Sequence, residues 1–230
     1  RGPLKALSSN STDVENTFDS VRAFDTDGFT IGTSAATNSS GSSYVAWCWD
    51  AGDTTVSNDA GSITSSVRAN TAYGFSVVTY TGNGVNGATV GHGLGAAPSM
   101  IITKKRNAVG TDYGWSTYHV SNGTANVWLD KDNKDNPGNW LTAPTDTVFT
   151  PAILDYNNVN TATYVNYCFA EVSGYSKFGS YTGTGAAGNA VTTGFKPAFV
   201  MIKRKDSAGN WFMFDSTRDA GSTGGNTLWA

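Results

Sequence analysis

The sequence repeats itself, and this repetition constrains the fold more than any other feature. The segment Phe75–Tyr80, bounded by glycines, returns as Tyr175–Tyr181 with one residue inserted, and Pro98–Lys105 returns as Pro197–Arg204. A stretch that recurs at a fixed period indicates one structural unit that is written more than once. The period of about 100–120 residues is too long for a solenoid rung. We therefore expect compact domains in tandem.

A second pair of matching segments sets the phase of the units. Tyr44–Trp49 corresponds to Tyr164–Phe169, which lies 120 positions later. Residues 1–52 therefore match the second half of an upstream unit, residues 53–173 a linker and a complete unit, and residues 174–230 the first half of a downstream unit. Two explanations stay open here. The chain was cut from a longer array, or neighbouring copies complete one another's halves.

Side-chain alternation and turn residues predict an all-β fold. The strong helix formers are scarce, with two Glu and seven Leu in 230 residues. Strands are expected at Phe75–Tyr80, at Met100–Arg106, at Tyr44–Trp49 and at Tyr164–Phe169, separated by Gly/Asn/Ser clusters. The last two segments are apolar on both faces, which predicts central strands that are covered on each side. We expect antiparallel, jelly-roll-like β-sandwich units.

Charge and hydropathy exclude several classes of protein. A formal net charge of −3 gives no basic surface for nucleic acid. The sequence has no run of about 18 apolar residues, so no membrane insertion is expected. The two cysteines, Cys48 and Cys168, occupy the same position of the repeat inside aromatic segments. We therefore expect two buried reduced thiols rather than a disulfide.

The glycine-rich segments carry a resemblance to a known family. The relevant stretches are Gly74–Gly84 followed by Gly91–Pro98, Tyr164–Val172 leading into Gly174–Gly185, and Gly194–Arg204. They resemble a repeated β-rich domain of large structural and tail-fibre proteins of marine bacteriophages, and the resemblance covers nearly the whole chain. It implies a virion or extracellular location, a homo-oligomer such as a trimer or a polymer, and contacts with other virion proteins. It supplies no catalytic residues.

No motif for catalysis stands out in the sequence. The G-x-S-x-G elbow, the H-E-x-x-H metal motif and the P-loop are absent. His92 lies in a glycine-rich turn and His119 at an expected strand end, and neither has partners at a recognisable spacing. The basic runs Lys104–Arg106 and Lys203–Lys205 recur in phase, and we expect them to form solvated strand ends.

One acidic segment offers oxygen ligands for a cation. Asp130, Asp132 and Asp135 are weak candidates for Ca²⁺, which prefers such ligands. The EF-hand spacing fails, because Lys134 falls where an oxygen ligand belongs. We interpret the segment as a solvated loop and expect no cofactor beyond this weak Ca²⁺ possibility.

Aromatic residues beside turns are the candidates for glycan binding. Trp140 adjoins a polar loop that contains Asn136 and Asn139, so an exposed indole there would stack on a sugar ring. Trp115 and Trp211 recur in phase, and for them packing in a core competes with a binding role.

Three functions of different classes follow from the sequence. We expect a virion structural protein, a tail-fibre or appendage module that assembles and attaches to a host surface glycan or receptor. The first alternative is a glycan depolymerase with two carboxylates across a sugar-binding groove. The second is a self-assembling extracellular filament or adhesin subunit whose copies share half-units.

Overall fold

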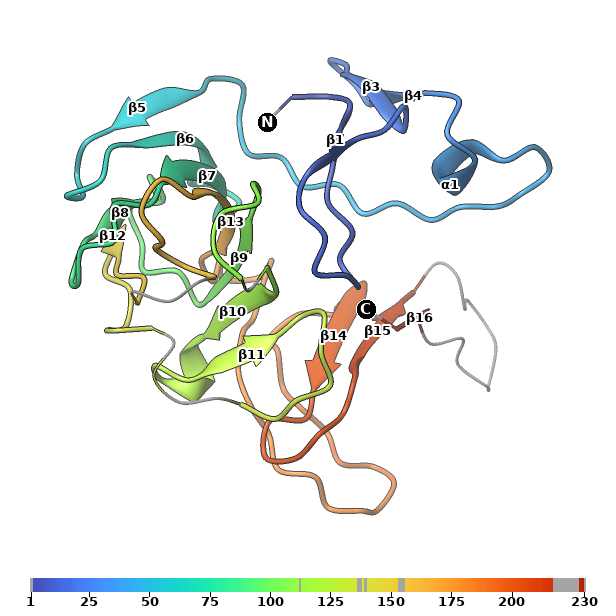
Figure 1. Cartoon of the computed structure of the whole chain (residues 1–230). Helices are drawn as coiled ribbons and strands as arrows, with labels where there is room; N and C mark the ends of the chain where they lie inside the picture. The colour runs from blue at the N-terminus through green and yellow to red at the C-terminus, as the bar shows by residue number, and fades with distance from the viewer. Residues whose placement is uncertain are drawn as a thin grey trace.

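The chain folds into β-sheets joined by turns and long loops (Figure 1). The computed structural model describes residues 2–111, 113–135, 138, 140–152, 156–216 and 228–229. Within these residues the helices are single turns, α1 (Ala35–Asn38) and η1 (Val120–Asn122). The expected all-β class is confirmed, because the strands are many and their pairing is antiparallel.

The strands are short, with two to seven residues each. They are β1 (Lys5–Ala6), β2 (Asn16–Thr17), β3 (Val21–Phe24), β4 (Phe29–Ile31), β5 (Val56–Asn58), β6 (Ser65–Asn70), β7 (Phe75–Thr81), β8 (Val90–Gly91), β9 (Met100–Lys105), β10 (Trp115–His119), β11 (Asn126–Trp128), β12 (Val148–Phe149), β13 (Thr163–Phe169), β14 (Phe199–Lys203), β15 (Trp211–Asp215) and β16 (Leu228–Trp229). The strands expected around Phe75, Met100 and Tyr164 are thereby confirmed.

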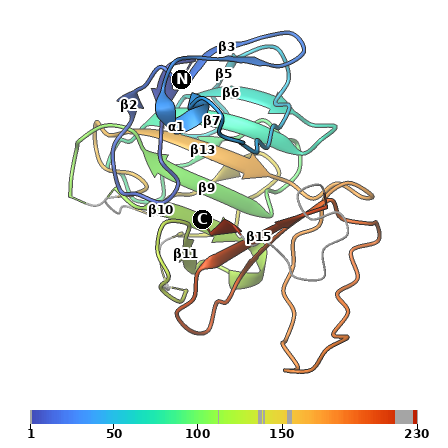
Figure 2. The same ribbon diagram turned by 90° about the vertical axis from the view of Figure 1, so that its right-hand side faces the viewer.

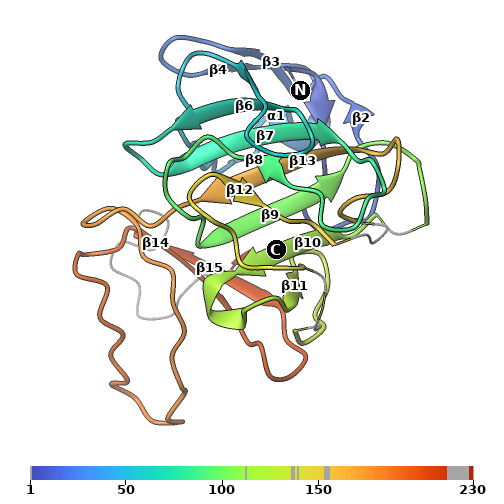
Figure 3. The same cartoon turned by 90° about the vertical axis from the view of Figure 1, so that its left-hand side faces the viewer.

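A seven-stranded antiparallel sheet dominates the molecule. Its order is β11-β10-β9-β13-β7-β6-β5, so β13 lies in the middle, between β9 and β7 (Figure 3). Cys168 of β13 stands opposite Ile101 on one side and Ser76 on the other. The prediction that this segment forms a central strand is confirmed. All seven strands come from Val56–Trp128 and Thr163–Phe169, inside the stretch expected to hold the complete unit.

Both faces of this sheet are covered where β13 crosses it. On one face the pair β8–β12 and nearby loops form a second layer, which makes a sandwich with the large sheet. Tyr164 and Cys168 of β13 point into this core. On the other face Tyr167 packs in a smaller cluster. That cluster contains Trp115, Val127, Leu129 and Trp211, with Leu7, Ile102 and Met201 around them.

A separate three-stranded sheet of order β14-β15-β16 lies beside the large sheet (Figure 2). Its strands β14 and β15 match β9 and β10 in sequence. Between β13 and β14 the chain makes a long excursion, in which residues 179–192 have exposed side chains and no strand (Figures 2 and 3). Three expectations stay predictions: that whole units repeat, that they have the residue bounds given above, and that their strands are connected as in a jelly roll.

The strand expected at Tyr44–Trp49 does not form. The segment has no β pairing, and Tyr44, Val45, Trp47 and Trp49 are 37–50% exposed. Its sequence matches β13, but β13 becomes a strand because β7 and β9 lie on its two sides. No such neighbours reach Tyr44–Trp49 within the described residues, so the pattern alone cannot make it a strand.

Candidate functional site

The end of β9 holds a lysine that docks a distant part of the chain. Lys104 is fully buried, and its Nζ donates to the carbonyl oxygens of Ser11 (3.3 Å) and Tyr113. The same ammonium lies 5.4 Å from the centroid of the Trp115 ring. A buried ammonium is unfavourable unless polar or aromatic groups surround it, and here they do. The expected solvated strand end is therefore wrong for Lys104, and also for Lys105, which is fully buried with Nζ 4.3 Å from the Tyr113 ring.

Two further contacts hold the same stretch of chain on the sheet. The indole Nε1 of Trp115 donates to the carbonyl of Ser8 at 2.9 Å. The amide of Glu15 donates to the carbonyl of Arg106 at 3.0 Å. The Arg106 guanidinium also forms a two-pronged ion pair with the Glu15 carboxylate, at 3.0 and 3.1 Å. We call residues 8–15 the first docked segment.

The same three contacts occur a second time on β14 and β15. Nε1 of Trp211 donates to the carbonyl of Trp128 at 2.7 Å, and Nζ of Lys203 donates to the carbonyls of Lys131 (3.2 Å) and Gly209. The amide of Asp135 donates to the carbonyl of Lys205 at 3.0 Å. Residues 128–135 are thus a second docked segment.

The two docked segments are related by a constant offset. Ser8 and Trp128, Ser11 and Lys131, and Glu15 and Asp135 are each 120 positions apart, as are Cys48 and Cys168. One pattern of contacts therefore joins two successive stretches of chain to two successive strand pairs. This pattern could not be predicted from residue types, because backbone carbonyls accept the bonds from the lysine and the tryptophan and every residue has a carbonyl. The sequence signal that points to the docking pattern is the recurrence of Lys104 and Trp115 as Lys203 and Trp211.

The tryptophans proposed for glycan binding are buried. Trp115 and Trp211 are each 5% exposed and lie in the cluster between the sheets, which supports packing over binding. Trp140 is 1% exposed, and its ring makes edge contacts with Tyr118 and Phe149 at 5.7 and 6.1 Å. The expected exposed indole at Trp140 is wrong, because the core of the sandwich takes up its whole surface. Asn136 and Asn139 lie outside the described residues.

The three weak Ca²⁺ candidates serve the docking pattern instead. The Asp130 carboxylate accepts from the amide of Trp115 at 2.9 Å, and the Asp132 carbonyl accepts from the amide of Gly209 at 2.7 Å. Asp135 donates its amide to Lys205, as described above. In the part of the chain that the structure describes, no three His, Cys, Asp or Glu side chains gather to hold a metal ion. The aspartates are therefore not brought together as a Ca²⁺ site.

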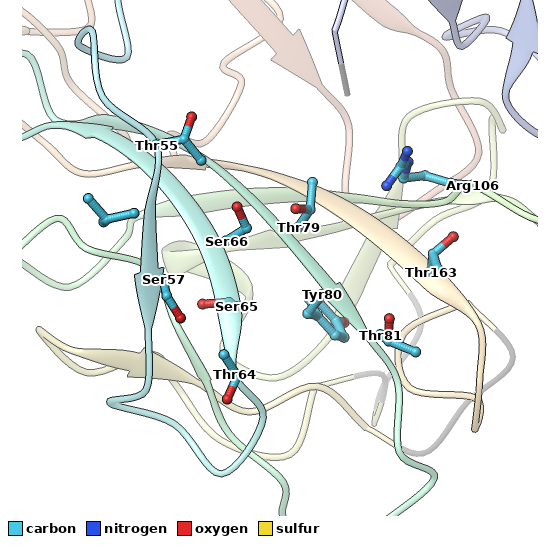
Figure 4. A pocket seen from close by; sticks show the side chains of 11 residues that line it. Thr55, Ser57, Thr64, Ser65, Ser66, Thr79, Tyr80, Thr81, Arg106 and Thr163 are labelled. Atoms are coloured by element: carbon cyan, nitrogen blue, oxygen red, sulfur yellow. The ribbon is translucent and has the colours of Figure 1, made fainter.

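An open, hydroxyl-lined cavity of about 410 Å³ lies over β5, β6, β7 and the start of β13 (Figure 4). Ser66 stands opposite Thr79 there, and Thr81 opposite Thr163, so hydroxyl groups follow one another across the strands. Arg106 borders the cavity with its guanidinium already paired to Glu15. No carboxylate is among the described lining residues, so this cavity offers no acid pair of the kind that glycoside hydrolysis needs.

The two cysteines differ although the segments around them match in sequence. Both are free thiols, which confirms that they do not pair, but Cys48 is exposed and Cys168 is buried. The expected burial of Cys48 is wrong, because no neighbouring strands among the described residues cover the segment Tyr44–Trp49. Burial raises the pKa of the Cys168 thiol to about 12.

This difference predicts a simple thiol count. In dilute solution one thiol per native chain reacts rapidly with the disulfide reagent DTNB, because thiolate is the reactive form and Cys168 is both buried and protonated. The second reacts only after denaturation. The variant Cys48→Ser should lose the fast phase, and two rapidly reacting thiols in the native chain would contradict the structure.

The two histidines predict a loss of stability on acidification, because burial affects the titration of both. Burial lowers the pKa of both His92 and His119 below the ordinary value near 6.5. As the pH falls, the histidines of the unfolded chain are therefore protonated before those of the folded chain. Their contribution to the free energy of unfolding is present above pH 6.5 and is lost as the pH drops below it. The free energy of unfolding should decline between pH 7 and 5 by up to about 1.4 kcal/mol per pH unit for each histidine.

Denaturant unfolding at a series of pH values checks this expectation. Nδ1 of His92 accepts a hydrogen bond from the amide of Leu94, and its Nε2 lies 3.2 Å from the carbonyl oxygen of Thr145. His92→Gln removes that titration, so its stability should depend less steeply on pH. An unfolding free energy that stays flat or rises toward pH 5 in the unaltered chain would show that burial does not hold these rings neutral.

Comparison with known proteins gives one match. A family model described as a domain of unknown function, DUF7483, matches residues 1–228. No curated protein and no solved structure matches the chain. Among the described residues, no helix has the length and apolar character needed to cross a membrane.

Proposed function

Because the chain belongs to the DUF7483 family, whose function is unknown, we propose its role from its own contacts. It is a structural module of an extended fibre, in which successive β-units stack on one another through the docking pattern. Its place is the tail fibre or another appendage of a bacteriophage virion, where it meets copies of itself, other virion proteins and a host surface glycan or receptor.

The recurrence of the docking pattern carries this proposal. A contact that joins one patch to a different patch is heterologous, and repeating it generates an open array rather than a closed pair. The two docked segments are related by one offset, and the donors to both are a lysine and a tryptophan. Arrays of this kind gain stability from each neighbour contact, which suits a protein whose task is to extend from a particle.

The chemistry of the pattern suits a rigid joint. Each lysine ammonium bridges a carbonyl of the docked segment and a carbonyl of the strand hairpin itself. Burial lowers the pKa of Lys203 while nearby Asp132 opposes this effect. Each indole adds a hydrogen bond and an apolar face, so hinge motion between a docked segment and its hairpin would break several bonds at once.

The resemblance in sequence and two exposed regions support the attachment role. Tyr175 and Tyr181 are each 51% exposed; Tyr175 lies shortly before the excursion that precedes β14, and Tyr181 lies within it. Exposed aromatic rings can stack on sugars, and the hydroxyl groups of the cavity can bind polyols. These are the surfaces through which we propose contact with a glycan.

Immunogold electron microscopy tests the proposed location. Antibodies raised against the chain should label fibres or appendages of virions from its source. Label confined to filaments on the cell surface would favour the adhesin alternative, and label in neither place would overturn the proposal. Release of reducing sugar ends from host polysaccharide by the purified chain would instead establish the depolymerase.

A further inference from the structure

The large sheet shows which strand belongs beside β14. In that sheet β13 lies between β9 and β7 and pairs with both along its length. The counterparts of these three strands in the repeat are Tyr44–Trp49 for β13, β14 for β9 and Tyr175–Tyr181 for β7. The second set is present in this chain but is not assembled.

In the part of the chain that the structure describes, one edge of β14 has no partner strand. Among the described residues β14 pairs with β15 alone, and no backbone hydrogen bond joins its other edge to a strand. Ile101 and Thr103 of β9 are 0 and 1% exposed, whereas their counterparts Val200 and Ile202 of β14 are only half-buried. An open, apolar strand edge is a ready template for a further strand.

The segment that matches β13 is equally incomplete. Tyr44 and Val45 are 49 and 50% exposed, whereas Tyr164 and Val165 of β13 are fully buried. Within the described residues no backbone hydrogen bond holds Tyr44–Trp49 to another strand. The apolar side chains that β13 buries between two neighbours thus lie at the surface in Tyr44–Trp49.

We propose that Tyr44–Trp49 of one copy adds as a strand to the open edge of β14 in a second copy. This inference rests on the proposed assembly role and names its partner, a second copy of this chain. The pairing of β13 with β9 gives the register, in which Cys48 stands opposite Val200 and Trp47 opposite Met201. Strand addition uses main-chain hydrogen bonds for affinity and alternate side chains for specificity.

The contacts of the segment in its own chain favour a second copy as the partner. Trp49 is held near the large sheet, with its ring 6.2 Å from Phe75 and 6.0 Å from Phe169. Trp47 meets Phe199 of β14 at 5.7 Å through the rings only. The register from the repeat places Trp49, not Trp47, opposite Phe199. Pairing in this register within one chain would therefore require Trp49 to leave Phe75 and Phe169. The β14 strand of a second copy has no contact with Trp47 that fixes its position, so it can pair with the segment while Trp49 stays against the large sheet.

The consequence is a linear polymer. Each copy offers one segment and one strand edge at different places, so the contact is heterologous, and repeating it generates a filament when the rotation between copies does not close a ring. The β14–β15 hairpin of one copy would then hold its own second docked segment and, at the other edge of β14, the Tyr44–Trp49 strand of a second copy. The order of contacts along such a polymer would be the same as within one chain.

A cysteine at position 200 tests the register directly. Val200→Cys, oxidised with copper phenanthroline at high protein concentration, should form a disulfide between copies through Cys48, because directly opposed residues lie about 4.5–5.5 Å apart at Cβ. Non-reducing gels should then show a ladder of dimers, trimers and larger species that reduction abolishes. Met201→Cys is the matched control, since its side chain faces Trp47, and Val200→Cys with Cys48→Ser removes the second thiol.

The unaltered chain provides a second measurement that needs no variant. Cys48 should react fast with DTNB in dilute solution and more slowly as concentration rises, and an added peptide of residues 42–51 should shorten the polymers seen by light scattering. A disulfide within single chains of Val200→Cys, equal ladders for both cysteine variants, or a strictly monomeric chain at high concentration would overturn the inference. None of these results bears on the docking pattern, which Lys104 tests separately.

Discussion

Replacing Trp140 with alanine is expected to lower the free energy of unfolding by about 3–5 kcal/mol, the range for truncating a large buried aromatic side chain. The indole is 1% exposed and contacts Tyr118 and Phe149 in the core of the sandwich. Its removal leaves a cavity that these rings cannot fill. Urea unfolding followed by circular dichroism at neutral pH measures the change.

Trp140→Phe is the matched control, because it keeps an aromatic ring at the same place. It should lose less than half as much stability as the alanine variant. If Trp140 were instead a platform for sugar, both variants would unfold like the parent and would lose glycan binding. Equal stability of Trp140→Ala and the parent would therefore return this residue to the list of binding candidates.

Replacing Lys104 with methionine is expected to release the first docked segment from the sheet. The change keeps the length of the side chain but removes the ammonium that holds the carbonyls of Ser11 and Tyr113. Hydrogen bonds from a charged group contribute about 1.5–3 kcal/mol each. Hydrogen exchange at the amide of Glu15, which donates to Arg106, should therefore accelerate about 10- to 100-fold.

Lys203→Met is the reciprocal control for this prediction. It should accelerate exchange at the amide of Asp135, the residue that occupies the same place in the second docked segment, and leave Glu15 unchanged. Lys104→Met should show the opposite selectivity. If neither lysine affects its own segment, the docking pattern does not hold the segments, and the proposed stacking of units loses its support.

The parts of the fold that local pattern decides could be predicted from the sequence. The strands β7, β9 and β13 follow from alternation and turn residues, and the central place of β13 follows from its two apolar faces. The same reasoning failed for Tyr44–Trp49, whose pattern is equally suited to a central strand. A strand needs neighbours as well as a suitable sequence, and no pattern within six residues reports whether those neighbours are present.

The burial of the lysines was beyond prediction for a different reason. A run of lysine, lysine and arginine at a strand end is normally solvated. Lys104 departs from this rule because the carbonyls of Ser11 and Tyr113 accept hydrogen bonds from its ammonium. Every residue has a carbonyl, so such a partner cannot be read from residue types. Trp140 shows the converse, since a polar loop next to it in sequence concealed its place in the core.

The docking pattern carries a consequence for how such proteins change over time. Residues 8–15 and 128–135 share no amino acid at equivalent positions, yet they accept the same bonds from a lysine and a tryptophan. These bonds recognise the main chain, so they do not fix which side chains stand at the positions that accept them. Lineages can thus duplicate, exchange or diversify modules while neighbouring modules remain compatible, provided that the two donors are kept.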